Sequence, residues 1–128
     1  MIIDTDVLIW FYRGDETARK AVLNAVPFKV SAITYIELLE GIRNKDELGK
    51  LKKDFSGWGV EILHINESAS LKATALVERY KLSHNLGLAD SLIAATVLEN
   101  NEILLTGNVK HYSYIKNLNI NKFERPQK

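Results

Sequence analysis

The chain contains no cysteine, only 2 prolines and 7 glycines, and no long apolar run. The missing thiols exclude a disulfide scaffold, a cysteine-ligated zinc or iron–sulfur site, and a cysteine nucleophile. The longest apolar run, residues 7–12, is far shorter than the about 20 residues that span a bilayer. We therefore expect no membrane association and no disulfide-dependent fold.

The 128 residues are 46% hydrophobic and 26% charged, which is typical of a folded domain and not of a disordered chain. No repeat, low-complexity tract or linker-like stretch interrupts them, so we expect residues 1–128 to form one domain. Asp4 and Asp6 lie where an export signal would carry positive charge. The sequence therefore predicts a cytoplasmic protein.

The net charge of +1, with histidine neutral, favours no class of partner. Residues 110–128 nevertheless carry five basic side chains against one acid, Glu124. A solvated surface is the usual explanation of such a stretch, and contact with nucleic acid is the alternative. The five are Lys110, Lys116, Lys122, Arg125 and Lys128.

Short apolar segments alternate with segments of helical periodicity along the chain. Strands are predicted at residues 1–4, 28–32, 60–65, 102–106 and 120–123. Helices are predicted at residues 6–13, 16–26, 34–44, 46–55, 67–81 and 88–99. This alternation predicts an α/β fold, namely a three-layer α/β/α sandwich with a mainly parallel central sheet.

Four carboxylates lie among apolar residues: Asp4, Asp6, Glu37 and Asp90. An ionised carboxylate in such surroundings is costly unless it is paired, hydrogen-bonded or bound to a metal. Each also has a structural explanation. Asp4 or Asp6 can cap the helix that follows, and Asp90 can cap a helix over residues 91–99. Thr34 and Glu37 match the spacing of a capping box.

The predicted topology favours a shared site, because ligands of open parallel sheets bind beyond the carboxyl ends of the strands. Asp4 ends the first strand, and Thr106 and Asn108 close the fourth. Glu37 and Asp90 lie near the starts of helices, so we expect all five at one edge of the sheet. Carboxylate and amide oxygens suit Mg²⁺ or Mn²⁺ better than a soft metal. The residues alone predict metal-assisted hydrolysis of a phosphate ester.

Four segments together resemble the PIN domain, most closely the VapC-type toxins of type II toxin–antitoxin pairs. Their sequences are MIIDTDVLI, SAITYIELLEG, LGLADSLIAA and LTGNVKHY, which begin at residues 1, 31, 86 and 105. The resemblance spans nearly the whole chain. Any one of these motifs is weak evidence, whereas four in the right order and spacing are strong evidence.

The resemblance implies a Mg²⁺-dependent endoribonuclease, with Mn²⁺ as a substitute, in which a metal-activated water hydrolyses the RNA. It implies catalytic roles for Asp4, Glu37, Asp90 and Asn108, the first three as metal ligands. It implies supporting or phosphate-contacting roles for Thr5, Asp6, Thr34 and Thr106, with Thr34 as the hydroxyl that opens its helix.

The resemblance also implies three partners: an RNA substrate, a VapB-like antitoxin that holds the enzyme inactive, and a second copy of the chain in a homodimer. Single-stranded or looped RNA is expected, because its backbone can bend into a shallow groove. Lys45 or Lys110 is expected to hold that backbone.

Three positions depart from the family pattern. Asn108 replaces a common aspartate, which leaves open whether one or two metal ions bind. Gly107 replaces a polar residue and His111 an aspartate; His111 is expected to lie on the surface or to contact phosphate. A catalytically weak or inactive PIN-like module that serves RNA binding or interaction is therefore the main alternative. A signalling receiver is the other, but residues 60–65 lack the aspartate it needs at the end of the third strand.

Overall fold

The structure is a computed structural model that describes residues 1–126, in which five strands form one sheet. The strands are β1 (Ile2–Ile3), β2 (Lys29–Ser31), β3 (Glu61–Leu63), β4 (Ile103–Thr106) and β5 (Asn119–Lys122). Each overlaps a predicted strand; β1 to β4 are shorter than predicted, and β5 has the predicted length but begins one residue earlier. Lys128, which we counted in the basic C-terminal stretch, lies outside the described residues.

The helices also follow the predicted order. They are α1 (Thr5–Tyr12), α2 (Glu16–Ala25), α3 (Ala32–Glu40), α4 (Lys45–Trp58), α5 (Glu67–His84), α6 (Leu88–Glu99) and the short 3-10 helix η1 (Val109–His111). Within residues 1–126, no helix is both long enough and apolar enough to cross a membrane.

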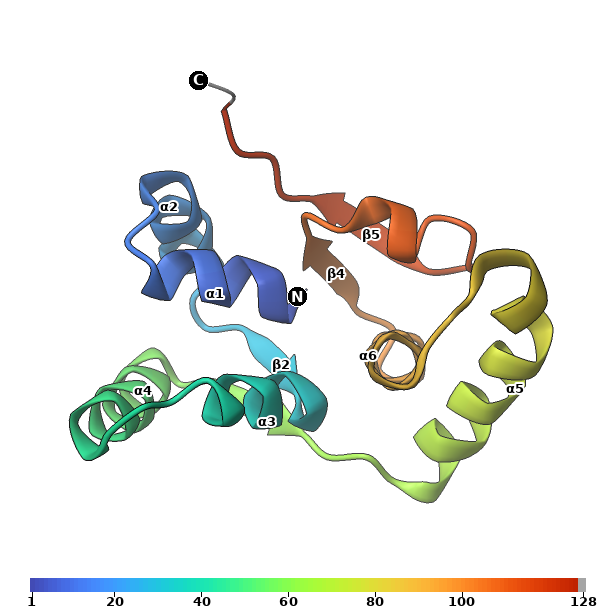
Figure 1. Ribbon diagram of the computed structural model, residues 1–128, viewed down its shortest axis with the longest axis horizontal. Coiled ribbons are helices and arrows are strands. Elements are labelled where there is room, and N and C mark those ends of the chain that lie inside the picture. The colour runs from blue at the N-terminus through green and yellow to red at the C-terminus, as the bar shows by residue number, and fades with distance from the viewer. Residues whose placement is uncertain (127–128) are drawn as a thin grey trace.

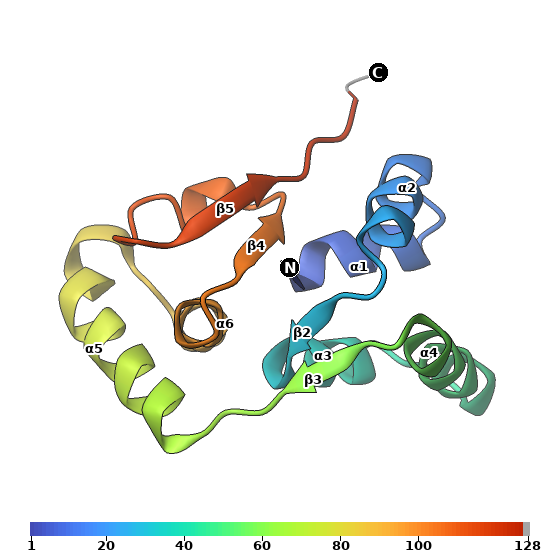
Figure 2. The same cartoon turned by 180° about the vertical axis from the view of Figure 1, so that it is seen from behind.

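All neighbouring strands are parallel, in the order β3-β2-β1-β4-β5. Helices α1, α2 and α4 cover one face of the sheet, and α5 and α6 cover the other (Figures 1 and 2). The predicted three-layer sandwich with a parallel sheet is confirmed. Because β1 and β4 are adjacent in the middle of the sheet, their carboxyl ends lie side by side.

Alternate residues of the central strands fill two separate cores, as the two-residue period of a strand requires. Ile3 and Leu105 pack with the α1, α2 and α4 side chains. Ile2 and Leu104 pack with α5 and α6. All four are buried or nearly so, which fixes β1 and β4 in the sheet and with them the residues that follow each strand.

Two predicted caps are wrong. Helix α3 begins at Ala32, because the Ser31 hydroxyl accepts a hydrogen bond from the Ile33 amide at 3.1 Å. Thr34 therefore does not open the helix, and Glu37 lies in its interior, which rules out the capping box. Helix α6 begins at Leu88 after Gly87, so Asp90 lies in its first turn instead of capping it.

Candidate active site

Asp4 lies at the junction of β1 and α1 and is only 3% exposed. Its Oδ1 accepts a hydrogen bond from the Thr5 amide at 2.8 Å, so Asp4 does cap α1. Its Oδ2 accepts a hydrogen bond from the Thr106 hydroxyl, also at 2.8 Å. Burial, together with the charges of Asp6 and Asp90, raises the pKa of Asp4 to about 6. Asp4 thus combines a capping role with a place among other acids.

Glu37 joins the site through a threonine. The Thr5 hydroxyl donates a hydrogen bond to Glu37 Oε1 at 2.7 Å, and the Thr5 and Thr34 hydroxyl oxygens lie 3.0 Å apart. Both threonines are buried, whereas Glu37 is partly exposed. The network links α3 to the start of α1, and so places Glu37 beside the residues that follow β1.

Two residues from the turn after β4 contact the carboxylate of Asp90. The Tyr112 hydroxyl donates a hydrogen bond to Asp90 Oδ1 at 3.1 Å, and His111 Nδ1 lies 3.2 Å from Asp90 Oδ2. Sequence reasoning missed Tyr112 and did not pair His111 with an acid. The available signal was that a tyrosine packed into the core needs an acceptor for its hydroxyl.

Asp6 faces the Thr106–Asn108 segment from the first turn of α1. Its Oδ2 accepts a hydrogen bond from the Gly107 amide at 2.9 Å, whereas its Oδ1 is buried without a hydrogen-bond partner in the described structure. Burial raises the pKa of Asp6. The Asn108 amide donates to the Thr106 hydroxyl at 3.0 Å, and Asn108 itself is exposed. A catalytic role for the Asn108 side chain stays a prediction.

Glycine at position 107 is required by the carboxylate of Asp6. A Cβ atom there would lie 2.7 Å from Asp6 Oδ2 and 3.4 Å from the Phe123 ring. We expect Gly107→Ala to lower the free energy of unfolding by about 1–3 kcal/mol, because the carboxylate has to shift away from its hydrogen bond. Urea denaturation measures this loss.

Gly49→Ala is the matched control, since a Cβ at this position in α4 meets nothing within 4 Å. Alanine is a better helix former than glycine, so we expect this control to gain up to about 1 kcal/mol. Equal unfolding midpoints for Gly107→Ala and the wild type would contradict the tight contact with Asp6.

The acids fit a divalent cation in charge and ligand type, although they do not enclose one in this arrangement. Among residues 1–126, no three histidine or acidic side chains are gathered closely enough to hold a metal ion. However, Asp4 is buried within the electrostatic reach of Asp6 and Asp90, and Asp6 Oδ1 has no hydrogen-bond partner among the residues that the structure describes. A hard cation with oxygen ligands would relieve both conditions. The residues therefore fit Mg²⁺ or Mn²⁺.

A groove of about 620 Å³ lies beside Glu37, between α1, α3 and the start of α4. Its apolar lining includes Ile9, Leu38, Ile42 and Leu51, and its charged lining includes Arg13, Arg43, Glu47 and Lys50. Glu37 also lines the groove, which therefore combines an apolar surface with three basic and two acidic side chains, one of them an acid of the candidate site.

A family model described as the PIN domain matches residues 1–116. The ribonuclease VapC10 of Mycobacterium tuberculosis is 32% identical over 124 residues, which cover 92% of this chain and 90% of the relative. A toxin–antitoxin complex from Klebsiella pneumoniae contains a chain with a TM-score of 0.78 at 25% identity, covering 91% of this chain and 93% of that one. VapBC2 from Rickettsia felis, bound to a promoter DNA fragment, gives a TM-score of 0.82 at 20% identity, over 96% and 98% of the chains. The last match concerns the fold alone.

Proposed function

Because this chain belongs to the PIN-domain family, as a ribonuclease toxin of the VapC type, we propose that it hydrolyses RNA phosphodiester bonds with a divalent cation. One observation carries the metal dependence. Asp4 is buried at the carboxyl end of β1, and the charges of Asp6 and Asp90 help to raise its pKa. Such a concentration of negative charge at the end of a parallel strand is expected of a cation site.

We assign the cation to Asp4, Glu37 and Asp90, and take Mg²⁺ as the ion with Mn²⁺ as a substitute. When bound, such an ion activates a water for attack and neutralises charge on the phosphate. Thr106 and the Thr5 amide hold the Asp4 carboxylate, and the Thr5 hydroxyl holds Glu37. Thr34 supports Thr5, to which its hydroxyl is hydrogen-bonded.

In this scheme Asp6 and Asn108 both adjoin Gly107, whose amide donates a hydrogen bond to Asp6 Oδ2. Asn108 is exposed, so its side-chain amide can orient water or a phosphate oxygen. Asp6 supplies a further carboxylate at the position next to Asn108, where the family commonly has a fourth acid. Its unpartnered Oδ1 supports that role.

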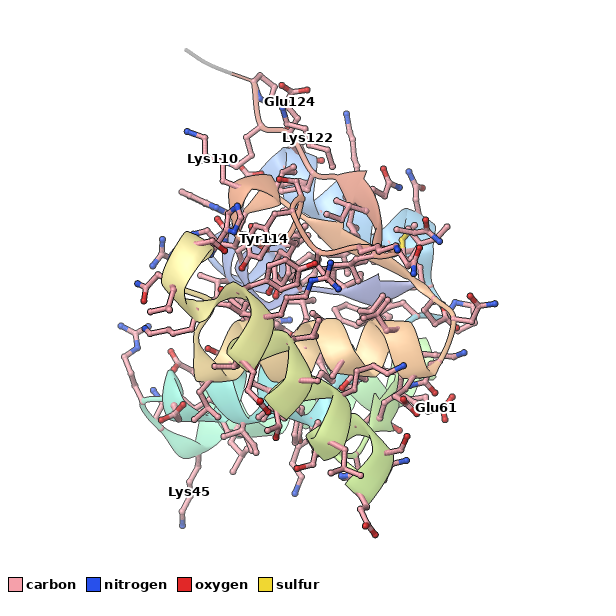
Figure 3. The ribbon with its side chains drawn as sticks, turned by 90° about the vertical axis from the view of Figure 1, so that its right-hand side faces the viewer. Lys45, Glu61, Lys110, Tyr114, Lys122 and Glu124 are labelled. Atoms are coloured by element: carbon pink, nitrogen blue, oxygen red, sulfur yellow. The ribbon has the colours of Figure 1, made fainter. Side chains whose placement is uncertain are left out.

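The RNA is expected to be single-stranded or looped. Lys45 and Lys110 lie at opposite ends of the molecule in Figure 3. An RNA chain that contacts both would therefore run across the molecule and not bind at one patch. Lys110 is next to His111, which contacts Asp90, so we assign the phosphates nearest the scissile bond to Lys110.

We further propose that residues 1–128 act as one cytoplasmic domain in a homodimer, and that a VapB-like antitoxin inhibits it. The groove beside Glu37 suits the antitoxin, because a peptide can bury apolar side chains there while a basic one faces the acids. The solved complex from Klebsiella pneumoniae, described as toxin–antitoxin, supports such a partner.

The experiment that tests this function is incubation of antitoxin-free protein with total cellular RNA in Mg²⁺, in Mn²⁺ and in EDTA. We expect discrete fragments in either metal and none in EDTA. Attack by water leaves linear phosphate ends, whereas attack by the RNA's own 2′-hydroxyl leaves 2′,3′-cyclic phosphates. End-labelling of the fragments distinguishes the two reactions.

Cleavage that persists in EDTA, or cyclic phosphate ends, would contradict the proposal. Tight RNA binding by folded protein without cleavage in either metal would favour the alternative, a PIN-like module with weak or no catalysis. Two observations stand on that side: the exposed side-chain amide of Asn108 in place of a fourth acid, and the absence, among residues 1–126, of three acidic or histidine side chains gathered closely enough to hold a metal ion.

A further inference from the structure

The Tyr112 ring is packed in the core next to Asp90 of the candidate site. The residue is 1% exposed and belongs to the core cluster that includes Ile93 of α6 and Leu104 of β4. Its hydroxyl donates a hydrogen bond to Asp90 Oδ1 at 3.1 Å. A buried hydroxyl on a packed ring has little freedom to move, so this donor stays at one point in space.

The turn after Asn108 brings a second side chain to the same carboxylate. The His111 amide donates to the Asn108 carbonyl at 2.9 Å, and the Tyr112 amide donates to the Val109 carbonyl at 3.1 Å. His111 Nδ1 thereby lies 3.2 Å from Asp90 Oδ2. The two oxygens of Asp90 thus have partners that differ in burial. The His111 side chain is 57% exposed, whereas Tyr112 is buried.

We infer that Tyr112 is a positioning residue that anchors Asp90 Oδ1 and so leaves Oδ2 to face the cation. The inference rests on the proposed metal-dependent function and adds to it a residue outside the predicted ligand set. His111 is exposed and can turn away when Oδ2 binds a cation, whereas Tyr112 remains in place.

The competing explanation is that Asp90 merely satisfies a buried hydroxyl, without consequence for metal binding. The two explanations differ in which quantity changes. Partners that orient a ligand typically alter metal affinity by about 10–100-fold when removed. A hydrogen bond that serves only the fold alters the melting temperature and leaves metal affinity unchanged.

The test is a titration of the full chain with Mn²⁺, without RNA, in which electron paramagnetic resonance reports free Mn²⁺. Tyr112→Phe keeps the ring and removes the hydroxyl. We expect its Mn²⁺ affinity to fall about tenfold, with cleavage recovering at saturating Mn²⁺. Tyr80→Phe is the matched control, because Tyr80 is buried in the same core cluster and its hydroxyl accepts only from the Lys116 amide in the described structure. We expect its affinity to equal that of the wild type.

Equal Mn²⁺ affinities for Tyr112→Phe and the wild type would overturn the inference, and so would loss of folding in Tyr112→Phe by circular dichroism, which would make the hydroxyl a requirement of the fold. An equal loss in Tyr80→Phe would also overturn it. Failure of the proposed function is a separate result, since the wild type would then bind no Mn²⁺.

Discussion

Replacing Asp4 by asparagine is expected to slow RNA cleavage at least about a hundredfold. Removal of a group that only orients a metal ligand typically lowers metal affinity or activity about 10–100-fold. Asp4 is proposed to bind the cation itself, so its removal should lower the cleavage rate further. Asparagine keeps the size of the side chain and one oxygen, which preserves the packing at the end of β1. Initial cleavage rates at saturating Mg²⁺ measure the effect, and expression of the variant should no longer arrest growth.

Asp46→Asn provides the matched control, because it makes the same chemical change at an exposed residue in the first turn of α4. We expect it to cleave RNA at the wild-type rate. Cleavage by Asp4→Asn within a few-fold of the wild type would remove Asp4 from the catalytic site.

The same substitution is expected to stabilise the metal-free protein at neutral pH. The pKa of Asp4 is raised from 3.8 to about 6 in the folded protein, so the folded state holds the Asp4 proton more tightly than the unfolded state. Well below pH 3.8 Asp4 is protonated in both states, and its burial costs the fold no ionisation free energy. As the pH rises from about 4 to 6, ionisation of Asp4 progressively lowers the free energy of unfolding. Above pH 6 this loss is complete and reaches roughly 3 kcal/mol. Asparagine cannot ionise and so avoids it.

Melting temperatures in EDTA from pH 4 to pH 8 test this expectation. Asp4→Asn should melt several degrees above the wild type at pH 7.5, and the gap should narrow as the pH falls toward 4. Groups far from Asp4 titrate alike in both proteins, so their contributions to the pH dependence cancel in the difference, whereas the coupling of Asp4 to Asp6 and Asp90 belongs to the effect that is measured. A gap that is independent of pH, or a variant less stable than the wild type at pH 7.5, would contradict the burial of an ionised Asp4.

The sequence was sufficient for the fold class and for part of the site. Apolar segments of strand length that alternate with amphipathic helices allow few arrangements other than a parallel sheet between helical layers. Asp4 and Thr106 end strands that became neighbours, and their side chains are hydrogen-bonded as the common edge of the sheet predicts. Strand order then accounts for their contact.

The rest depends on contacts that spacing does not encode. Ser31 and Thr34 are both good helix-capping residues, and which of them starts α3 is decided by where β2 ends against β3. The pairing of Thr5 with Glu37 spans 32 residues. Tyr112 and His111 reach Asp90 only because the chain turns tightly after Asn108, which no periodicity in the sequence reveals.

The position of the cation is the most direct test of the proposed site. Crystals of the antitoxin-free protein grown with Mn²⁺ would show the ion by its anomalous scattering. We expect a peak within about 2.5 Å of an oxygen of Asp4 and an oxygen of Asp90, and none there in Asp4→Asn. A peak elsewhere, or no peak in crystals of protein that cleaves RNA in Mn²⁺, would show that these carboxylates do not hold the catalytic metal.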